Sequence, residues 1–362
     1  MLHLRGEASL TPDQVRVLGI LTRTASTLSA LGVIAIITTF VASRHFRNPM
    51  HRLIFINAFY NAFDVTCTMI STSGPQAGNP SALCQFQAFL NQMFPVADVA
   101  WTLAMAANVY LIVFRSYDTV ALRKLEWKYA IVITVATFIP AFVFLFIRSD
   151  DKGLMYGSVT IWCAIAPNWV LMRIVVYYVP IWSMIFITIV LYCLVGLEIV
   201  KRRHALKSIN SDSDAILLDE TLRPENSAAS PNHNSTGKTT AVEFDDAQSH
   251  SRQASTSHSE SPMSTHHPQR LNTPRQSSAL SFRQYILMPL FFFLALLSVW
   301  VAPTTNRVAS FVNPSFSSYP LLLVVGTTGS LRGFWNGLVF VTIGMKSRKR
   351  RKDLEDVALH RL

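Results

Sequence analysis

Charged residues are scarce in this chain of 362 residues, at 15% of the sequence. Soluble proteins carry charge on about a quarter of their residues. The deficit is concentrated in long uncharged runs such as residues 24–43, and 50% of the chain is hydrophobic. These runs exclude an ordinary soluble domain and predict an all-α protein that crosses a membrane several times.

Cysteine is also scarce, and the 4 residues present exclude a disulfide-rich scaffold but allow one bridge. The sequence contains no Cys/His metal spacing, no phosphate-binding glycine loop and no hydrolase nucleophile motif. We therefore expect no enzyme, no metal and no cofactor. The net charge of +11 gathers at the ends of the apolar runs, which argues against a nucleic-acid partner.

Seven apolar runs are long enough to cross a bilayer core of about 30 Å. The third run, residues 84–115, contains Asp98 and several amide side chains. Polar groups in hydrocarbon need partners, so we expect this run to lie inside the bundle. Contacts between helices explain such residues as well as a functional role does. The seven runs cover residues 24–43, 53–72, 84–115, 129–147, 174–197, 284–303 and 319–343.

One long segment differs in composition from the apolar runs. Residues 204–281 contain 23 Ser or Thr in 78 positions and few large apolar side chains, so they bury too little surface to fold. We predict that they form a disordered loop, and that residues 1–23 form a short N-terminal segment. The predicted divisions are residues 1–23, 24–203, 204–281, 282–343 and 344–362.

Basic residues predict the orientation of the runs. The connections after runs one, three and five, and the tail, carry 3, 4, 3 and 6 basic residues near the membrane. The connections after runs two, four and six carry 0, 3 and 1. Because basic residues favour the cytoplasmic side, the N terminus is predicted to lie outside, with the Ser-rich loop and the basic tail inside.

Two cysteines are predicted to share the outer side. Cys84 begins the third run, and Cys163 lies in the outer loop of residues 148–173. Both positions face an oxidising compartment, so we predict a disulfide between them. Two buried free thiols are the alternative.

Four motifs carry a family resemblance. CQFQAFLNQMFPVADVAWTLAMAANVYL begins at Cys84, LEWKY occupies residues 125–129, MYG occupies residues 155–157, and LRGFWNGLV occupies residues 331–339. Together they resemble the cAMP-receptor-like family of G-protein-coupled receptors from slime moulds and fungi, which usually has Gln in place of Arg332. The resemblance implies a plasma-membrane receptor that acts through a heterotrimeric G protein. It leaves the ligand open.

Two positions depart from the rhodopsin-like receptors. Asn108 begins Asn-Val-Tyr where those receptors have Asp-Arg-Tyr, and Asn336 begins Asn-Gly-Leu-Val-Phe where they have Asn-Pro-x-x-Tyr. These departures argue against the rhodopsin-like class. The alternative function is a small seven-span transporter or channel, a class that favours internal repeats, and we find none.

The charges inside the runs predict an ion pair. Arg332 lies about 20 Å inward from the start of the seventh run, and Asp98 about 21 Å inward from the start of the third. A lone arginine at that depth costs at least about 3 kcal/mol, so a partner is expected. We predict that Arg332 pairs with Asp98, with Asp64 as the second candidate. An unpaired Arg332 in a hydrated cavity is the alternative.

Ligand binding is predicted at the outer mouth of the bundle. Cations and large aromatic rings there suit an anionic or planar small molecule or nutrient, although anchoring at the membrane interface explains them as well. The candidates are Asp98, Trp162, Arg173, Trp300 and Arg307.

Basic residues at the inner ends of the runs are predicted to face a G protein, and they also determine topology. We expect the basic tail to attract anionic membrane lipid. The candidate G-protein contacts are Arg115, Arg123, Lys124, Lys201, Arg202 and Arg203.

The predicted orientation gives a direct test at Asn234, which begins the one Asn-x-Ser/Thr site without proline in the sequence. A cytoplasmic Asn234 is not exposed to the glycosylation machinery, so we expect treatment with a glycosidase to leave the mobility of the protein unchanged. A glycan on Asn234 would contradict the orientation.

Overall fold

The computed structural model describes residues 10–43, 49–221, 275–312 and 318–359. It divides into two units, one formed by Met1–Arg202 with Gln276–Leu362 and the other by Arg203–Arg275. In the second unit the described residues, 203–221 and 275, are helical. Asn234 and most of the predicted disordered loop lie outside the described residues.

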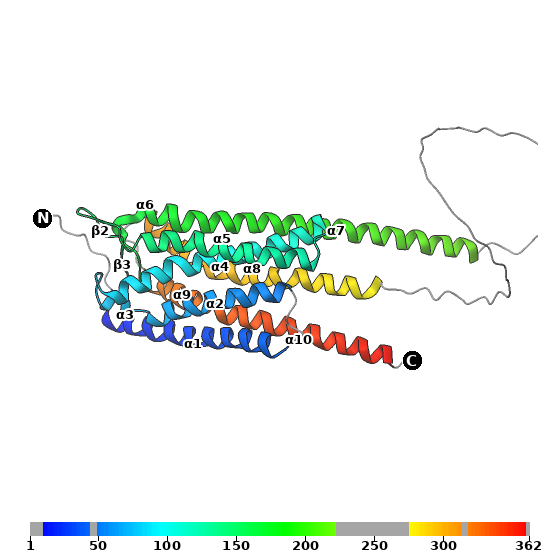
Figure 1. The fold of residues 1–362 in the computed structure, drawn as a ribbon, viewed down its shortest axis with the longest axis horizontal. Helices are drawn as coiled ribbons and strands as arrows, with labels where there is room; N and C mark the ends of the chain where they lie inside the picture. The colour runs from blue at the N-terminus through cyan, green and yellow to red at the C-terminus, as the bar shows by residue number, and fades with distance from the viewer. Residues whose placement is uncertain (1–9, 44–48, 222–274, 313–317, 360–362) are drawn as a thin grey trace, which may run out of the picture. The chain divides into compact units, whose positions relative to one another are not determined.

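The first unit is a bundle of long helices (Figure 1). Within the described part of the chain, 6 helices are long and apolar enough to cross a membrane. The seventh crossing is made jointly by α9 (Tyr319–Ser330) and α10 (Arg332–Leu359), which completes the predicted seven-helix bundle. The six are α1 (Pro12–Ala42), α2 (Pro49–Ile70), α4 (Ala82–Arg115), α5 (Thr119–Val143), α7 (Val179–Thr221) and α8 (Arg275–Val312).

Polar caps determine where three helices begin. The Thr11 hydroxyl accepts a hydrogen bond from the Gln14 N–H at 3.3 Å, and the Thr11 N–H donates to the Gln14 side chain at 3.0 Å. This capping box starts α1 well before its uncharged run begins at residue 24. Ser81 and Asp118 cap α4 and α5 with their side chains.

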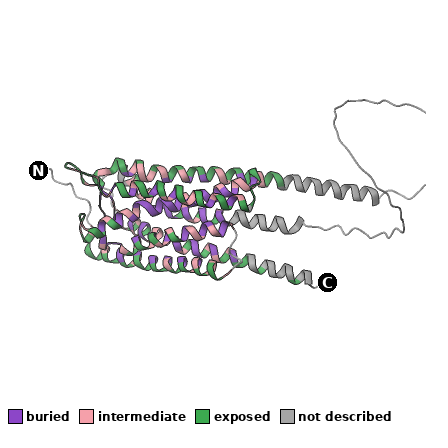
Figure 2. Ribbon diagram, in the orientation of Figure 1, coloured by how far each residue is buried: buried purple, intermediate pink, exposed green. Residues whose placement is uncertain are grey.

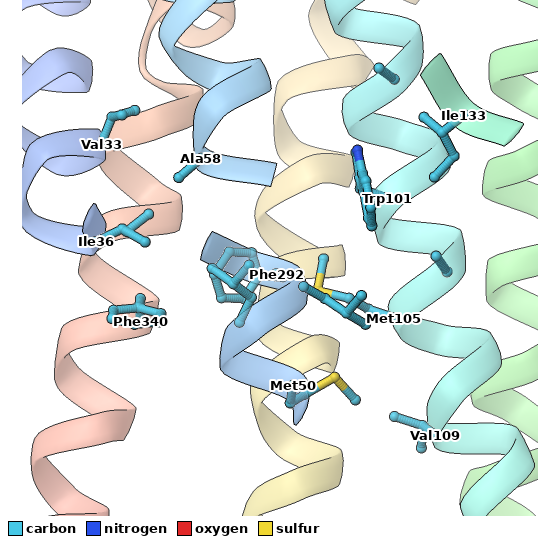
Figure 3. Packing of buried hydrophobic residues seen from close by; sticks show 14 of the residues in the cluster. Val33, Ile36, Met50, Ala58, Trp101, Met105, Val109, Ile133, Phe292 and Phe340 are labelled. Carbon is cyan, nitrogen blue, oxygen red and sulfur yellow. The ribbon is translucent and has the colours of Figure 1, made fainter. Parts of the chain in front are cut away.

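The helix α4 lies inside the bundle, as its polar residues predict. In its apolar stretch 67% of the residues are buried, against 17–39% in the other five helices. Figure 2 shows the buried residues concentrated along the inner helices. Trp101 and Met105 of α4 form a core with Phe292 of α8 and Phe340 of α10 (Figure 3). The most buried helix therefore carries the most intramembrane polar groups, which must find protein partners.

The helices continue into both ends of the predicted disordered loop, so that prediction is wrong there. α7 runs to Thr221, and α8 begins at Arg275. Residues 204–221 contain neither Gly nor Pro, and extending an existing helix is easier than starting one. α10 likewise continues into the predicted tail as far as Leu359.

The outer loop between α5 and α7 contains two antiparallel hairpins where the sequence predicts only a loop. β1 (Arg148–Ser149) pairs with β2 (Gly153–Leu154), and β3 (Tyr156–Val159) pairs with β4 (Trp162–Ile165). The chain then enters α7 through the short helical segments η2 (Pro167–Trp169), α6 (Val170–Arg173) and η3 (Ile174–Tyr178).

A buried tyrosine attaches the second hairpin to α5. The Tyr156 hydroxyl donates to the Ala141 carbonyl at 2.9 Å. Burial raises the pKa of this hydroxyl far above its ordinary value, so it remains a donor. The hairpin is thereby held over the end of the bundle.

Glycines allow α1 and α10 to approach backbone to backbone. A Cβ added to Gly337 would lie 2.6 Å from the Cα of Gly32, and one added to Gly333 would lie 3.0 Å from the Ser29 carbonyl oxygen. Gly333 and Gly337 are four residues apart and so face the same side of α10. Gly337 occupies the position at which rhodopsin-like receptors have proline, and the close contact with α1 explains its small size here.

We expect Gly337→Ala to destabilise the bundle by about 1–3 kcal/mol, because the new methyl group overlaps the α1 backbone. Thermal unfolding of the purified protein in detergent measures the change. Gly196→Ala on α7 is the matched control, since its Cβ meets nothing within 4 Å. Equal unfolding temperatures for the two variants would contradict the predicted contact.

Candidate functional site

A cavity of about 1180 Å³ lies at the outer end of the bundle. Its wall is formed by residues of α1, α2, α4, η2, α6, η3, α7, α8 and α9 and by the first residue of α10, and the β3–β4 hairpin covers part of it. This size suits a small molecule, and ligand pockets commonly lie between helices of a bundle.

The hairpin is fixed over the cavity by the predicted disulfide. Cys84 and Cys163 are bonded, with their Cα atoms 5.4 Å apart, and both are fully buried. The bridge joins the start of α4 to β4, so the prediction of a disulfide is confirmed.

Gln87 on α4 reinforces the bridge. Its side-chain amide donates to the carbonyls of Cys67 and Ser71 at 3.2 and 2.9 Å, and its oxygen accepts from the Cys163 N–H at 2.9 Å. Gly74 leaves room for this amide, because a Cβ there would overlap it. Gln87 thus ties α2, α4 and the hairpin together with one side chain, and the sequence shows no pattern that singles it out.

Two further amides of α4 hold the cavity wall. Asn91 donates to the Cys163 carbonyl at 3.4 Å, and Gln92 donates to the Val176 carbonyl at 3.5 Å. Both residues line the cavity. The two amides therefore link α4 to neighbouring segments and also face the cavity, so both a structural and a functional role stay open.

Two arginines line the cavity near its mouth. Arg173 is 7% exposed, and its guanidinium donates to the Ile165 carbonyl of β4. Arg307 on α8 is partly buried and donates to the Tyr178 hydroxyl at 3.1 Å. Neither arginine forms an ion pair among the described residues.

Aromatic rings form much of the remaining wall. Trp162, Tyr177 and Trp300 line the cavity. The rings of Tyr177 and Trp300 are 6.0 Å apart at their centroids and tilted, and Trp300 is buried. Such a wall can hold a planar group by ring contact.

Three charged residues lie together at the floor of the cavity. The Nη1 atom of Arg332 is 3.1 Å from Asp64 Oδ2, and its Nε atom is 3.6 Å from Asp98 Oδ2. All three residues are nine-tenths or more buried. The predicted contact with Asp98 is present, but Asp64 is the nearer partner, because Arg332 lies at the first turn of α10, where it reaches α2 as well as α4.

The two carboxylates have different surroundings. Asp98 accepts a hydrogen bond from the Asn57 amide at 2.8 Å. Asp64 and Arg332 line the cavity, whereas Asp98 lies behind them. Of the five predicted ligand-binding residues, Asp98 is therefore the one that does not reach the cavity surface. The other four, Trp162, Arg173, Trp300 and Arg307, line it.

The seventh crossing is interrupted where it meets these charges. Leu331 separates α9 from α10 with φ −87° and ψ 5°, outside helical values. Its N–H is shared between the carbonyls of Thr327 and Thr328 at 3.1 and 3.2 Å. Arg332 follows immediately, and its Cζ atom lies 5.9 Å from the centre of the Trp300 ring.

The remaining predicted residues lie away from the cavity. Asn108 is fully buried in α4 and accepts from the Tyr129 hydroxyl at 3.2 Å, and Asn336 is buried in α10. Arg202 donates to Glu198 at 2.8 Å and to the Val113 carbonyl at 2.9 Å, which joins α7 to α4. The side chain of Arg203 lies outside what the structure describes. Five of the predicted cations at the inner end are exposed: Arg115, Arg123, Lys124, Lys201 and Arg202.

A family model described as "Slime mold cyclic AMP receptor" matches residues 11–217, more than half of the chain. The chain belongs to this receptor family. The match includes the cysteines of the disulfide and five of the seven crossings. The resemblance drawn from the motifs is therefore confirmed.

The fold agrees with this assignment. Squid rhodopsin matches with a TM-score of 0.59 over 99% of this chain and 91% of the squid chain, at 13% sequence identity. Such a likeness establishes the fold, a seven-helix receptor bundle. No curated protein sequence matches the chain.

Family and fold together indicate a receptor of the G-protein-coupled type rather than an enzyme. They place it in the plasma membrane as a multi-pass protein, as the apolar helices require.

Replacing Arg332 with Leu leaves two buried carboxylates without their guanidinium. Removing one partner of a buried ion pair costs about 3–5 kcal/mol, so we expect a large loss of thermal stability in detergent. The triple variant R332L/D64N/D98N removes the stranded charges and should recover most of it. A triple variant no more stable than the single one would contradict the predicted electrostatic cost. Arg16→Leu, at an exposed position on α1, is the control and should change stability by about 0.5 kcal/mol or less.

Proposed function

We propose that the protein is a G-protein-coupled receptor that binds an extracellular anionic small molecule or nutrient in the cavity and activates a heterotrimeric G protein. The observation that carries this proposal is the buried guanidinium of Arg173 in the cavity wall. Its Nε group has no hydrogen-bond partner within the described part of the chain. Leaving such a group unsatisfied costs about 1–3 kcal/mol or more, and an anionic ligand would supply the missing acceptor.

The balance of charge along the wall favours an anion. Arg173 and Arg307 both line the cavity, and the carboxylate that lines it, Asp64, is already paired with Arg332. The mouth thus presents two cations without a counter-charge from the described lining residues. Two guanidinium groups suit a carboxylate or phosphate, which accepts several hydrogen bonds at once.

The aromatic wall supports a ligand with a planar part. Trp162, Tyr177 and Trp300 line the same cavity as the two arginines. An anionic molecule with a ring system would satisfy the arginines with its charged end and contact the aromatic rings with its planar end. Cyclic AMP has this combination, and the family's printed description makes it the first ligand to test.

The opposite end of the bundle is the proposed docking surface for the G protein. Arg115, Arg123, Lys124 and Lys201 are exposed there, while Arg202 joins α7 to α4. A basic surface of this kind would attract an acidic partner surface. The basic residues that follow in α10 would be drawn to anionic lipid headgroups at about 1 kcal/mol each.

The path from cavity to docking surface runs through α4 in this proposal. Asp98 meets Arg332 behind the cavity floor, and α4 continues to Asn108 and Arg115. A ligand that changed the Arg332 contacts would act on three helices at once. We propose that this group is the two-state element that ligand-driven switching requires.

The test is nucleotide exchange on a host Gα subunit, measured with purified receptor in nanodiscs with and without cAMP. We expect exchange to rise with cAMP, and Arg173→Gln or Arg307→Gln to reduce the apparent affinity at least about tenfold, because each removes a charge-assisted hydrogen bond. Arg148→Gln in the outer hairpin is the matched control, since Arg148 is exposed and outside the cavity wall.

The outcomes separate the parts of the proposal. If the receptor stimulates nucleotide exchange without cAMP and cAMP does not increase it, the receptor function is supported and other anionic ligands should be tested. A full response in the R173Q/R307Q double variant would contradict the assignment of the anion site. Absence of exchange under every condition would favour the transporter alternative.

A further inference from the structure

The three charges at the cavity floor do not balance. Two carboxylates, Asp64 and Asp98, face one guanidinium, Arg332, at 3.1 and 3.6 Å. With both carboxylates ionised the group carries one excess negative charge inside the bundle. Such a charge is costly at this depth, and two carboxylates that share a site resist being ionised together.

The contacts within the group are incomplete. The Nε and Nη1 groups of Arg332 form no hydrogen bond within the described residues, although carboxylate oxygens lie close to both. The ion pairs are therefore held by charge more than by hydrogen-bond geometry. Adding or removing one charge in this group should therefore change how Arg332 contacts Asp64 and Asp98.

Asp64 is the carboxylate that water from the cavity can reach. It lines the cavity, and so do Arg307 and Trp162 near the mouth, whereas Asp98 lies behind and accepts a hydrogen bond from Asn57. An added proton is therefore expected on Asp64 rather than on Asp98.

Apart from Arg332, the titratable groups that face Asp64 carry no positive charge. Arg332 approaches from α10 and Asp98 from α4. Cys67, one turn away on α2, and Tyr177 on η3 are the further titratable neighbours among the described residues. A thiol and a phenol cannot neutralise the excess negative charge, so a proton is the smallest species that can.

We propose that Asp64 is a proton-binding site, loaded from the extracellular side through the cavity, that uncouples α10 from α2. A hydronium ion in the cavity transfers a proton to the carboxylate: one O–H bond of hydronium breaks, one O–H bond forms on Asp64, and a water molecule remains. The group becomes neutral, with Arg332 paired to Asp98 alone. This site goes beyond the proposed ligand and adds sensitivity to extracellular acidity.

The position of the site gives the proton a mechanical effect. Arg332 begins α10 directly after the interruption at Leu331, so its contact with Asp64 ties the inner half of the seventh crossing to α2. Once Asp64 is neutral, the ionic attraction of that tie is lost. In this proposal Leu331 is the hinge at which α10 turns relative to α9, since element-terminal residues absorb the backbone changes of hinge motions.

Infrared difference spectroscopy on the purified full-length receptor tests the site without any G protein. Acidification from mildly alkaline to mildly acidic pH should produce the carbonyl band of a protonated carboxyl group in the wild type. Asp64→Asn should abolish that band. Asp151→Asn, at an exposed position in the outer hairpin, is the matched control and should leave it unchanged.

Two more variants must shift the titration in opposite directions. Asp98→Asn removes the second negative charge, so the midpoint of the band should move to lower pH by at least about one unit. Arg332→Gln removes the positive charge, so the midpoint should move to higher pH by at least about one unit. If R332Q fails to fold, the shift in the nearly isosteric D98N variant decides. Shifts in the same direction, or a band that survives in D64N, would overturn the proposal.

A cellular measurement tests the coupling. With cytosolic pH held constant, lowering the extracellular pH should change basal G-protein activation at least about twofold in the wild type and leave D64N unresponsive. A pH response that persists in D64N would overturn the proposed coupling. If the infrared band appears but no G protein responds, the proton site is supported. If the ligand drives nucleotide exchange but the band is absent, the proton site is overturned and the proposed receptor function still stands.

Discussion

Arg332 shares its charge between Asp64 and Asp98, and all three residues are nine-tenths or more buried inside the bundle. Because a charge in the bilayer interior needs a partner from the protein, α2, α4 and α10 must keep fixed positions around this guanidinium. The cavity, the aromatic wall and the interruption at Leu331 all adjoin the same group. A buried ion pair is weak evidence for stability, but it specifies which helices meet and at what depth.

Polar side chains organise the outer end of the bundle in a different way. Gln87 and Asn91 hold the hairpin that carries Cys163, and the disulfide closes the same connection covalently. These contacts keep a lid of fixed structure over the cavity. The mouth retains two cations, Arg173 and Arg307, and the Nε group of Arg173 has no hydrogen-bond partner among the described residues. Rigid support beside unsatisfied donors is what a site for an anionic ligand requires.

The contact between α1 and α10 depends on close backbone packing. α1 carries no charge between residues 24 and 42, and it approaches α10 through Gly32, Gly333 and Gly337. Since lipid is as apolar as leucine, helices gain little from the hydrophobic effect between them and associate through small residues that allow dense contact. The glycine in the Asn-Gly-Leu-Val-Phe motif is explained by this packing rather than by a hinge.

The sequence by itself determined the seven crossings, the family and the Cys84–Cys163 bridge, because hydropathy and short motifs are local properties. The orientation that the basic residues predict stays a prediction. It also placed Arg332 at a depth where a carboxylate partner is expected, with an unpaired arginine in a hydrated cavity as the alternative. Only the tertiary structure decided that Asp64 is the nearer partner, that Gln87 ties three segments together, and that Asp98 lies behind the cavity. Those features depend on how each helix is rotated about its axis and packed against its neighbours, which the hydropathy of an almost uniformly apolar run does not encode.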